Sequence, residues 1–223
     1  MALSIALDGP VGAGKSTIAD EVARRLGILH LDTGDMYRAV GLSALRRGLD
    51  IQDEAAVTAM CRELRITVTY GPGGQRTLVD GEDVTHLLRT EDVSLAASTV
   101  ARYAGVRQAM VALQRQLAAQ APMLLDGRDI GTRVLPQATV KIFLTATPEE
   151  RARRRYLELQ QKGAPDTYEQ VLRDLKARDE QDTHRVVDPL RAAEDAVVVD
   201  TTSLNFDQVV EAILAIVEEK AHV

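Results

Sequence analysis

Apolar positions recur along this chain in two alternating patterns, one with the spacing of strands and one with the spacing of helices. Residues 3–7 form a short apolar run that an Asp-Gly-Pro turn ends, which predicts a buried strand. Beyond the turn, Ile18, Val22 and Leu26 recur every fourth residue, and Gly27 follows as a helix stop. The pattern therefore predicts a strand, a turn and an amphipathic helix at the start of the chain.

The same alternation continues to the end of the sequence. Further apolar runs predict strands at about 29–31, 123–126, 140–144 and 197–200. Helical spacing and helix-capping residues predict helices at about 36–44, 54–64, 90–120, 148–161, 167–182 and 206–219. Strands that are separated by helices form mostly parallel sheets covered on both faces. We therefore expect a doubly wound α/β fold with two insertions.

One insertion has a different pattern. Residues 66–70 alternate strictly between apolar and polar positions, a Gly-Pro-Gly-Gly turn follows, and residues 77–80 resume a strand-like pattern. Asp80-Gly81 then adds a strong hairpin signal. The pattern predicts a small antiparallel β unit inserted into the α/β fold.

Composition narrows the class of protein. The net charge of −6 argues against a protein that coats nucleic acid or an anionic membrane through bulk charge. The lone Cys61 cannot form an internal disulfide, and no apolar run approaches the roughly 20 residues of a membrane helix. The N-terminus lacks the basic region of a signal peptide. These features predict a cytosolic protein.

Arginine greatly outnumbers lysine, with 22 residues against 5. Codon bias across a proteome is one explanation. The other is that some arginines bind phosphate or carboxylate groups through their planar guanidinium groups. Composition does not separate the two explanations.

Residues 9–16 match the phosphate-binding loop pattern G-x-x-x-x-G-K-[ST] at every fixed position, between a predicted strand and a predicted helix. In such a loop, backbone N–H groups and the helix N-terminus surround the phosphates, and Lys15 reaches the β- and γ-phosphates. The Ser16 hydroxyl is the predicted Mg²⁺ ligand. The predicted ATP-binding residues are Gly9, Pro10, Val11, Gly12, Ala13, Gly14, Lys15, Ser16 and Thr17.

Four further segments carry charged residues near the predicted carboxyl edge of the sheet, where open α/β sheets bind ligands. They are 32–38 (DTGDMYR), 126–129 (DGRD), 151–155 (RARRR) and the set Arg178, Asp182 and Arg185, spaced i, i+4 and i+7. Any one of them is explained by a solvated helix face. Together they favour an anionic acceptor.

These segments resemble the bacterial-type cytidylate kinases, a family of P-loop nucleoside monophosphate kinases. The resemblance runs from LDGPVGAGKST through LDTGDMYR, the β insertion, DGRDIGT and EERARRR to RDEQD and Arg185. It implies a three-layer P-loop NTPase fold with a mostly parallel sheet, a small antiparallel β insertion and a short helical lid. The implied single domain spans 1–223, with a core at about 1–35, 85–147 and 186–223, a monophosphate-binding region at 36–84 and a lid at 148–185.

The resemblance also implies a role for individual residues. Arg38, Arg128 and Arg185 match positions that hold the acceptor phosphate, and Thr33 stands where the family usually has Ser. Ser98, Arg107 and Asp129 match positions around the cytosine ring, and Arg178 and Asp182 match positions near the sugar. Arg151 and Arg155 are the expected lid arginines, with Arg154 as a rival. The implied catalytic residues are Lys15, Arg128, Arg151, Arg155 and Arg185.

The implied reaction is phosphoryl transfer from ATP to CMP or dCMP with Mg²⁺, by a cytoplasmic monomer without nucleic-acid or membrane partners. The acceptor phosphate is already largely anionic near pH 7, so no general base is expected. Cytosine fits the predicted pocket because its N4 amine donates to a carboxylate such as Asp129.

Two alternatives stay open. A kinase for a small acceptor, such as a sugar acid or a coenzyme precursor, would not need the β insertion or the pair Arg107 and Asp129. A nucleotide-dependent switch would not need the surplus of arginine, and the chain has no N-K-x-D segment for reading guanine.

Overall fold

The computed structural model describes residues 3–221, so positions 1, 2, 222 and 223 of the predicted domain lie outside the described residues. The chain divides into two compact units. One comprises the chain up to Leu29 and from Pro122 onward, and the other comprises His30–Ala121.

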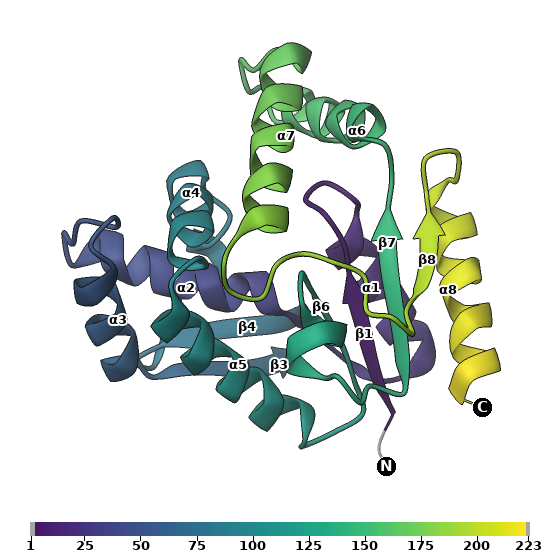
Figure 1. The fold of residues 1–223 in the computed structure, drawn as a ribbon, viewed down its shortest axis with the longest axis horizontal. Coiled ribbons are helices and arrows are strands. Elements are labelled where there is room, and N and C mark those ends of the chain that lie inside the picture. The colour runs from purple at the N-terminus through teal and green to yellow at the C-terminus, as the bar shows by residue number, and fades with distance from the viewer. Residues whose placement is uncertain (1–2, 222–223) are drawn as a thin grey trace. The chain divides into compact units, whose positions relative to one another are not determined.

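The main sheet has five strands in the order β2-β6-β1-β7-β8 (Figure 1). Their bounds are β1 Ser4–Asp8, β2 Leu29–Asp32, β6 Met123–Gly127, β7 Val140–Thr145 and β8 Val197–Asp200. Strand β1 pairs in parallel with β6 and β7, so that Leu7 lies opposite both Asp126 and Ile142. Strand β8 pairs in parallel with β7. The predicted strands are confirmed. The three central strands β1, β6 and β7 are mostly apolar and largely buried, as expected for parallel strands covered on both faces.

Helices α1 (Lys15–Leu26) and α8 (Phe206–Ala221) pack against this sheet. Their buried side chains, among them Val22 and Ile213, share one hydrophobic cluster with Ile5 and Leu144 of the strands. Gly27 ends α1 with a φ of 65°, as its place in the sequence predicted.

Helices α6 (Pro148–Gln161) and α7 (Tyr168–His184) pack on each other around Ala152, Val171 and Leu175. Thr147 caps α6 by accepting a hydrogen bond from the backbone N–H of Glu150. The helix predicted at 167–182 is confirmed to within two residues at each end. Helix α7 ends at His184, and Arg185 has an extended backbone with a ψ of 142°.

The second unit contains the remaining helices and a small sheet. Their bounds are α2 Thr33–Arg46, α3 Glu54–Glu63, β3 Ile66–Gly71, β4 Gly74–Val79, β5 Glu82–Asp83, the 3-10 helix η1 Thr85–Leu87, α4 Glu91–Val100 and α5 Ala104–Ala118. Strands β3, β4 and β5 pair antiparallel in that order. Asp80 and Gly81 join β4 to β5, and both have positive φ, as a type I′ hairpin turn requires. The predicted antiparallel insertion is confirmed.

The single helix predicted at 90–120 is two helices, because residues 101–103 leave the helical path between α4 and α5. Tyr103 is extended, with a ψ of 124°, and is 7% exposed. Its hydroxyl donates a 2.6 Å hydrogen bond to the backbone oxygen of Ile51. This contact with a distant segment has no signature in the local periodicity.

The mostly parallel five-stranded sheet with its helices and the separate antiparallel sheet confirm the predicted fold class. Helices α4 and α5 lie in the unit that contains the small sheet. The proposed division into core, monophosphate-binding region and lid stays a prediction. Among residues 3–221, no helix has the length and apolar character needed to cross a membrane.

Candidate functional site

The phosphate-binding loop follows β1 directly and leads into α1. A Cβ atom at Gly9 would lie 2.0 Å from the backbone oxygen of Leu144, so only glycine fits there. Lys15 is 6% exposed, and its Nζ donates a 2.8 Å hydrogen bond to the backbone oxygen of Pro10. Gly14, with a φ of 82°, directly precedes α1, so the loop leads into the N-terminus of the helix, where the helix dipole favours an anion.

Burial, followed by the positive charge of Arg128, lowers the pKa of Lys15 to about 7. Burial and Arg128 both disfavour the charged form of this amine, so a nearby anion would stabilise it. The phosphates of a nucleotide would provide such an anion. The loop therefore has the geometry and the charge to bind a nucleotide triphosphate.

A hydrogen bond connects Ser16, at the end of the phosphate loop, to Asp126 of β6. The Ser16 hydroxyl donates a 2.8 Å hydrogen bond to Asp126 Oδ2. The loop motif predicted Ser16 alone as a metal ligand, although Asp126 lies near the end of β6, the neighbour of β1 in the sheet. Parallel strands bring their carboxyl ends to one edge, and that rule could have identified Asp126.

Asp8 is a buried carboxylate that sequence analysis did not select. It is 4% exposed, and its two oxygens accept 2.7 Å hydrogen bonds from the backbone N–H groups of Ile130 and Gly131. These groups begin the short π-helix η2 (Ile130–Val134) after Asp129. Burial raises the pKa of Asp8 to about 6, against the opposing effect of the two backbone hydrogen bonds. Asp8 thus connects the end of β1 to the DGRDIGT segment.

Four of the predicted acceptor residues meet in a charged network. Arg128 Nε donates a 2.9 Å hydrogen bond to Asp182 Oδ2. Arg185 approaches Asp129 at 3.4 Å and Asp182 at 4.0 Å, although it lies beyond the end of α7. The side chains of Arg185 and Asp129 are only 5% and 7% exposed. These residues are therefore brought together by the fold and not by a shared helix face.

Arg178 extends this network on α7. Burial lowers the pKa of its guanidinium, and the nearby charges of Arg155 and Arg128 lower it further, against the opposing effect of Asp174 and Asp182. Arg155 is also paired with Glu158 on its own helix at 2.9 Å. Arg178 therefore lies close to two other arginines, and such a concentration of positive charge favours the binding of an anion.

The remaining lid arginines face protein acceptors. Arg151 is 3% exposed, and its guanidinium pairs with Asp179 at 2.7 Å. Arg154 donates to the backbone oxygen of Thr201 at 2.6 Å and pairs with Glu150 at 2.9 Å. Arg151 and Arg155 lie four residues apart on α6, yet the first is buried and the second is exposed.

In the unit His30–Ala121, two carboxylates and two arginines form a cluster at the start of α2. Arg38 pairs with Asp35, and Arg89 pairs with Asp32 at 2.9 Å and with Asp35 at 3.4 Å. Burial, followed by the charge of Asp32, raises the pKa of Asp35. Arg89 was not among the predicted site residues, because it lies in a segment without a recognisable motif. The predicted residue Thr33 is 3% exposed beside this cluster.

The two predicted base-binding residues of this unit lie on different helices. Ser98 lies on α4 and is half-buried. Arg107, on α5, is 1% exposed, and its guanidinium lies 5.5 Å from the centre of the Tyr37 ring. Arg107 Nη1 also donates a 3.2 Å hydrogen bond to the backbone oxygen of Ala101. Arg107 is therefore held in place by contacts within this unit.

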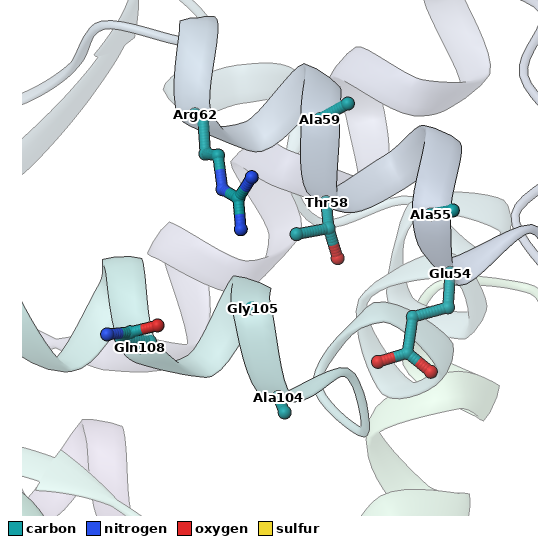
Figure 2. Close-up of a pocket in the computed structure, with 8 residues that line it drawn as sticks. All are labelled: Glu54, Ala55, Thr58, Ala59, Arg62, Ala104, Gly105 and Gln108. Atoms are coloured by element: carbon teal, nitrogen blue, oxygen red, sulfur yellow. The ribbon is translucent and has the colours of Figure 1, made fainter.

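A cavity of about 670 Å³ lies between α3 and α5 (Figure 2). Glu54, Arg62 and Gln108 lie along it, and Thr58 faces Gly105 across it. None of the predicted site residues lines this cavity. It is consequently not the candidate site.

Within residues 3–221, no group of three or more His, Cys, Asp or Glu side chains is arranged to hold a metal ion. Ser16 and Asp126 nevertheless provide two hard oxygen donors of the kind that Mg²⁺ uses together with water and phosphate. They fit a cation that is bound chiefly through a nucleotide.

Comparisons with known proteins agree with the geometry. Residues 5–219 match the family model described as cytidylate kinase. The cytidylate kinase of Bacillus licheniformis is 50% identical over 98% of this chain and 97% of its own length. That of Geobacillus kaustophilus is also 50% identical, over 98% of this chain and 97% of its own length.

Solved structures show the likeness of fold alone. A shikimate kinase from Bacteroides thetaiotaomicron has a TM-score of 0.50 at 14% identity and covers 99% of both chains. A gluconokinase from Sinorhizobium meliloti has a TM-score of 0.50 at 13% identity and covers 99% of this chain and 94% of its own.

Proposed function

The chain belongs to the cytidylate kinase family, whose members are ATP-dependent nucleoside monophosphate kinases, and on this premise we propose that it phosphorylates CMP and dCMP. The products are ADP and CDP or dCDP. We expect a monomer that works in the cytoplasm on small-molecule substrates, without nucleic-acid or membrane partners.

The phosphate loop is the proposed donor site. Its residues Gly9 to Thr17 bind the ATP phosphates through backbone N–H groups, and Lys15 places its charge against the β- and γ-phosphates. Ser16 and Asp126 hold Mg²⁺, which their hydrogen bond of 2.8 Å supports. When bound, the cation offsets negative charge on the phosphates.

The residues proposed to bind the acceptor nucleotide form two groups, one for its phosphate and one for its sugar. Arg38, Arg128 and Arg185 bind the monophosphate, and the Thr33 hydroxyl supports them. Arg178 and Asp182 contact the sugar. The positive charges of Arg155 and Arg128 near Arg178 support these assignments, because a bound phosphate would offset them.

Base recognition is assigned to Ser98, Arg107 and Asp129. The Asp129 carboxylate accepts from the N4 amine of cytosine, and it has enough lone pairs to accept from Arg185 as well. Arg107 suits the ring acceptors O2 and N3. Uracil would place an acceptor against Asp129 and leave buried polar groups unpaired, which disfavours UMP by orders of magnitude.

Transfer is proposed to be in line, with positioning and charge compensation as the main contributions of the protein. The acceptor phosphate needs no general base, because its second pKa of about 6 leaves it largely anionic near pH 7. Arg155 on α6, with Arg154 as a rival, is proposed to compensate charge on the transferred group. Closure of the lid excludes water.

The observation that carries this proposal is the network of Arg128, Asp129, Asp182 and Arg185, which brings two cations and two carboxylates together. The charges of Arg128 and Asp182 in this network act on Lys15 of the phosphate loop. The test is a coupled assay of ADP release with CMP, dCMP, UMP and AMP, with shikimate and gluconate as controls and Lys15→Ala as an inactive reference. Strong turnover with CMP and dCMP and little with AMP is expected. Turnover of a non-nucleotide acceptor, or of none, would refute the proposal.

A further inference from the structure

The guanidinium of Arg151 contacts three separate segments of the protein. Its Nε donates a 2.9 Å hydrogen bond to the backbone oxygen of Ala146, and Nη1 donates at 2.9 Å to the backbone oxygen of Val11. Asp179 of α7 accepts two further bonds, at 3.1 Å from Nη1 and 2.7 Å from Nη2. Four of the five N–H groups of this buried side chain are thus used by protein acceptors.

We propose that Arg151 is a positioning residue for the phosphate loop, held by Asp179, and that it acts on ATP through Val11 and not by touching phosphate. This inference rests on the proposed role of the loop in binding ATP. It assigns to the pair Arg151 and Asp179 a function that neither the loop motif nor the lid motif describes.

The peptide plane explains how the contact acts. In a trans peptide, the C=O of Val11 and the N–H of Gly12 point in opposite directions. A hydrogen bond that fixes the Val11 oxygen toward Arg151 therefore also fixes the direction of the Gly12 N–H, one of the groups proposed to bind phosphate. Fixing a binding group in advance raises affinity because less conformational freedom is lost on binding.

Apolar contacts hold the same part of the loop independently. Val11 packs against the cluster of Ala152, Val171 and Leu175 between α6 and α7. A Cβ atom at Gly12 would lie 3.2 Å from Leu175 Cδ1 and 3.4 Å from Arg151 Cβ. Polar and apolar contacts with α6 and α7 therefore both hold the middle of the loop in place.

Helix α7 also carries Arg178 and Asp182, the proposed sugar-binding residues. The pair Arg151 and Asp179 consequently connects the donor loop to the helix that holds part of the proposed acceptor machinery. A change in this pair should act first on ATP, because Arg151 contacts the loop directly.

The variant Asp179→Asn separates the two possible roles of Arg151. If Arg151 acts through Val11, losing the ionic partner loosens the loop, and ATP should bind at least 10-fold more weakly while KM for CMP changes less than twofold. If Arg151 binds phosphate directly, releasing it from Asp179 leaves ATP affinity unchanged or increases it. That result, or equal losses for ATP and CMP, would overturn the proposal.

A double variant, Arg151→Met with Asp179→Leu, tests whether weaker ATP binding occurs without a loss of stability. Replacing a buried ion pair by apolar side chains of similar volume is often neutral for stability. Its unfolding temperature should stay close to that of the wild type, while ATP binding weakens at least 10-fold because Val11 has lost its donor. Wild-type ATP affinity in this variant would overturn the proposal.

The matched control is Lys176→Met with Glu149→Gln. This exposed ion pair of 3.0 Å joins the same two helices and does not contact the loop. The control should bind ATP like the wild type, and an equal loss there would overturn the proposal. The affinity for ATP is measured by calorimetry with Mg·ATP and no acceptor. An inactive wild type in the CMP assay would refute the proposed function. It would leave the comparison of ATP affinities intact.

Discussion

The Ser16 hydroxyl donates a 2.8 Å hydrogen bond to the carboxylate of Asp126. Ser16 lies in the first turn of α1, and Asp126 lies near the end of β6, which is paired in parallel with the strand that enters the phosphate loop. More than a hundred residues of sequence separate the two side chains, and the sheet brings them together. Their oxygen atoms are the proposed protein contribution to Mg²⁺ binding.

Replacing Asp126 by Asn should raise the Mg²⁺ concentration needed for activity and lower the rate by about 100-fold, because a neutral amide is a poorer ligand for a hard cation. The measurement is the initial rate as a function of Mg²⁺ concentration at saturating CMP. Asp200→Asn is the matched control, since Asp200 ends the parallel strand β8 and accepts from Thr202. An unchanged Mg²⁺ dependence in the Asp126 variant would remove Asp126 from the metal site.

Asp129 provides a test of base recognition. Asp129→Ala should lower kcat/KM for CMP by about 100-fold or more, because a buried hydrogen bond to the base is lost. Basal hydrolysis of ATP should hardly change. Asp129→Asn should instead increase the ratio of UMP to CMP turnover, since an amide N–H can donate to O4 of uracil. Equal losses of CMP use and ATP hydrolysis would contradict the assignment.

Asp8 should make stability depend on pH. Burial raises the pKa of this carboxyl from 3.8 to about 6, so the folded protein binds the proton more tightly than the unfolded chain. Its contribution to stability is fully present below pH 3.8 and is lost as the pH rises through 6. The loss amounts to about 3 kcal/mol, of which about 2 kcal/mol falls between pH 4.5 and pH 7.

The variant Asp8→Asn has no such proton to lose. Its free energy of unfolding should therefore increase relative to the wild type by about 2 kcal/mol from pH 4.5 to pH 7. Urea denaturation at four pH values in this range measures the difference. A difference that stays constant with pH would show that Asp8 does not titrate as proposed.

Helices α3 and α5 approach closely at Thr58 and Gly105 (Figure 2). A Cβ atom at Gly105 would lie 2.2 Å from Thr58 Cγ2, so Gly105→Ala should destabilise the protein by about 1–3 kcal/mol. Thr58→Ala removes the clashing methyl and a hydroxyl that has no hydrogen-bond partner among the described residues. The double variant should unfold at or above the wild-type temperature, because alanine favours the helix over glycine. Thermal unfolding that shows no rescue would contradict this packing.

Local interactions explain what could be predicted from the sequence. The strand at residues 3–7, the helix of Ile18, Val22 and Leu26, and the caps at Asp53 and Thr147 depend on neighbours within a few positions. The loop of residues 9–16 is local in the same sense, since its glycines and the following helix are contiguous. Such elements are specified by short segments, and their boundaries were predicted to within a few residues.

Contacts between distant segments decided the rest. The break before Tyr103, the place of Arg185 beside Asp129 and the burial of Arg151 against Asp179 each depend on a partner far away in the chain. Periodicity could place an arginine on a helix, but it could not say whether the guanidinium meets a phosphate or a carboxylate of the protein. The sequence alone determined the order of elements, the phosphate loop and the resemblance to a kinase family. Only the tertiary structure decided which charges meet, because long side chains find their partners after the backbone has brought remote segments together.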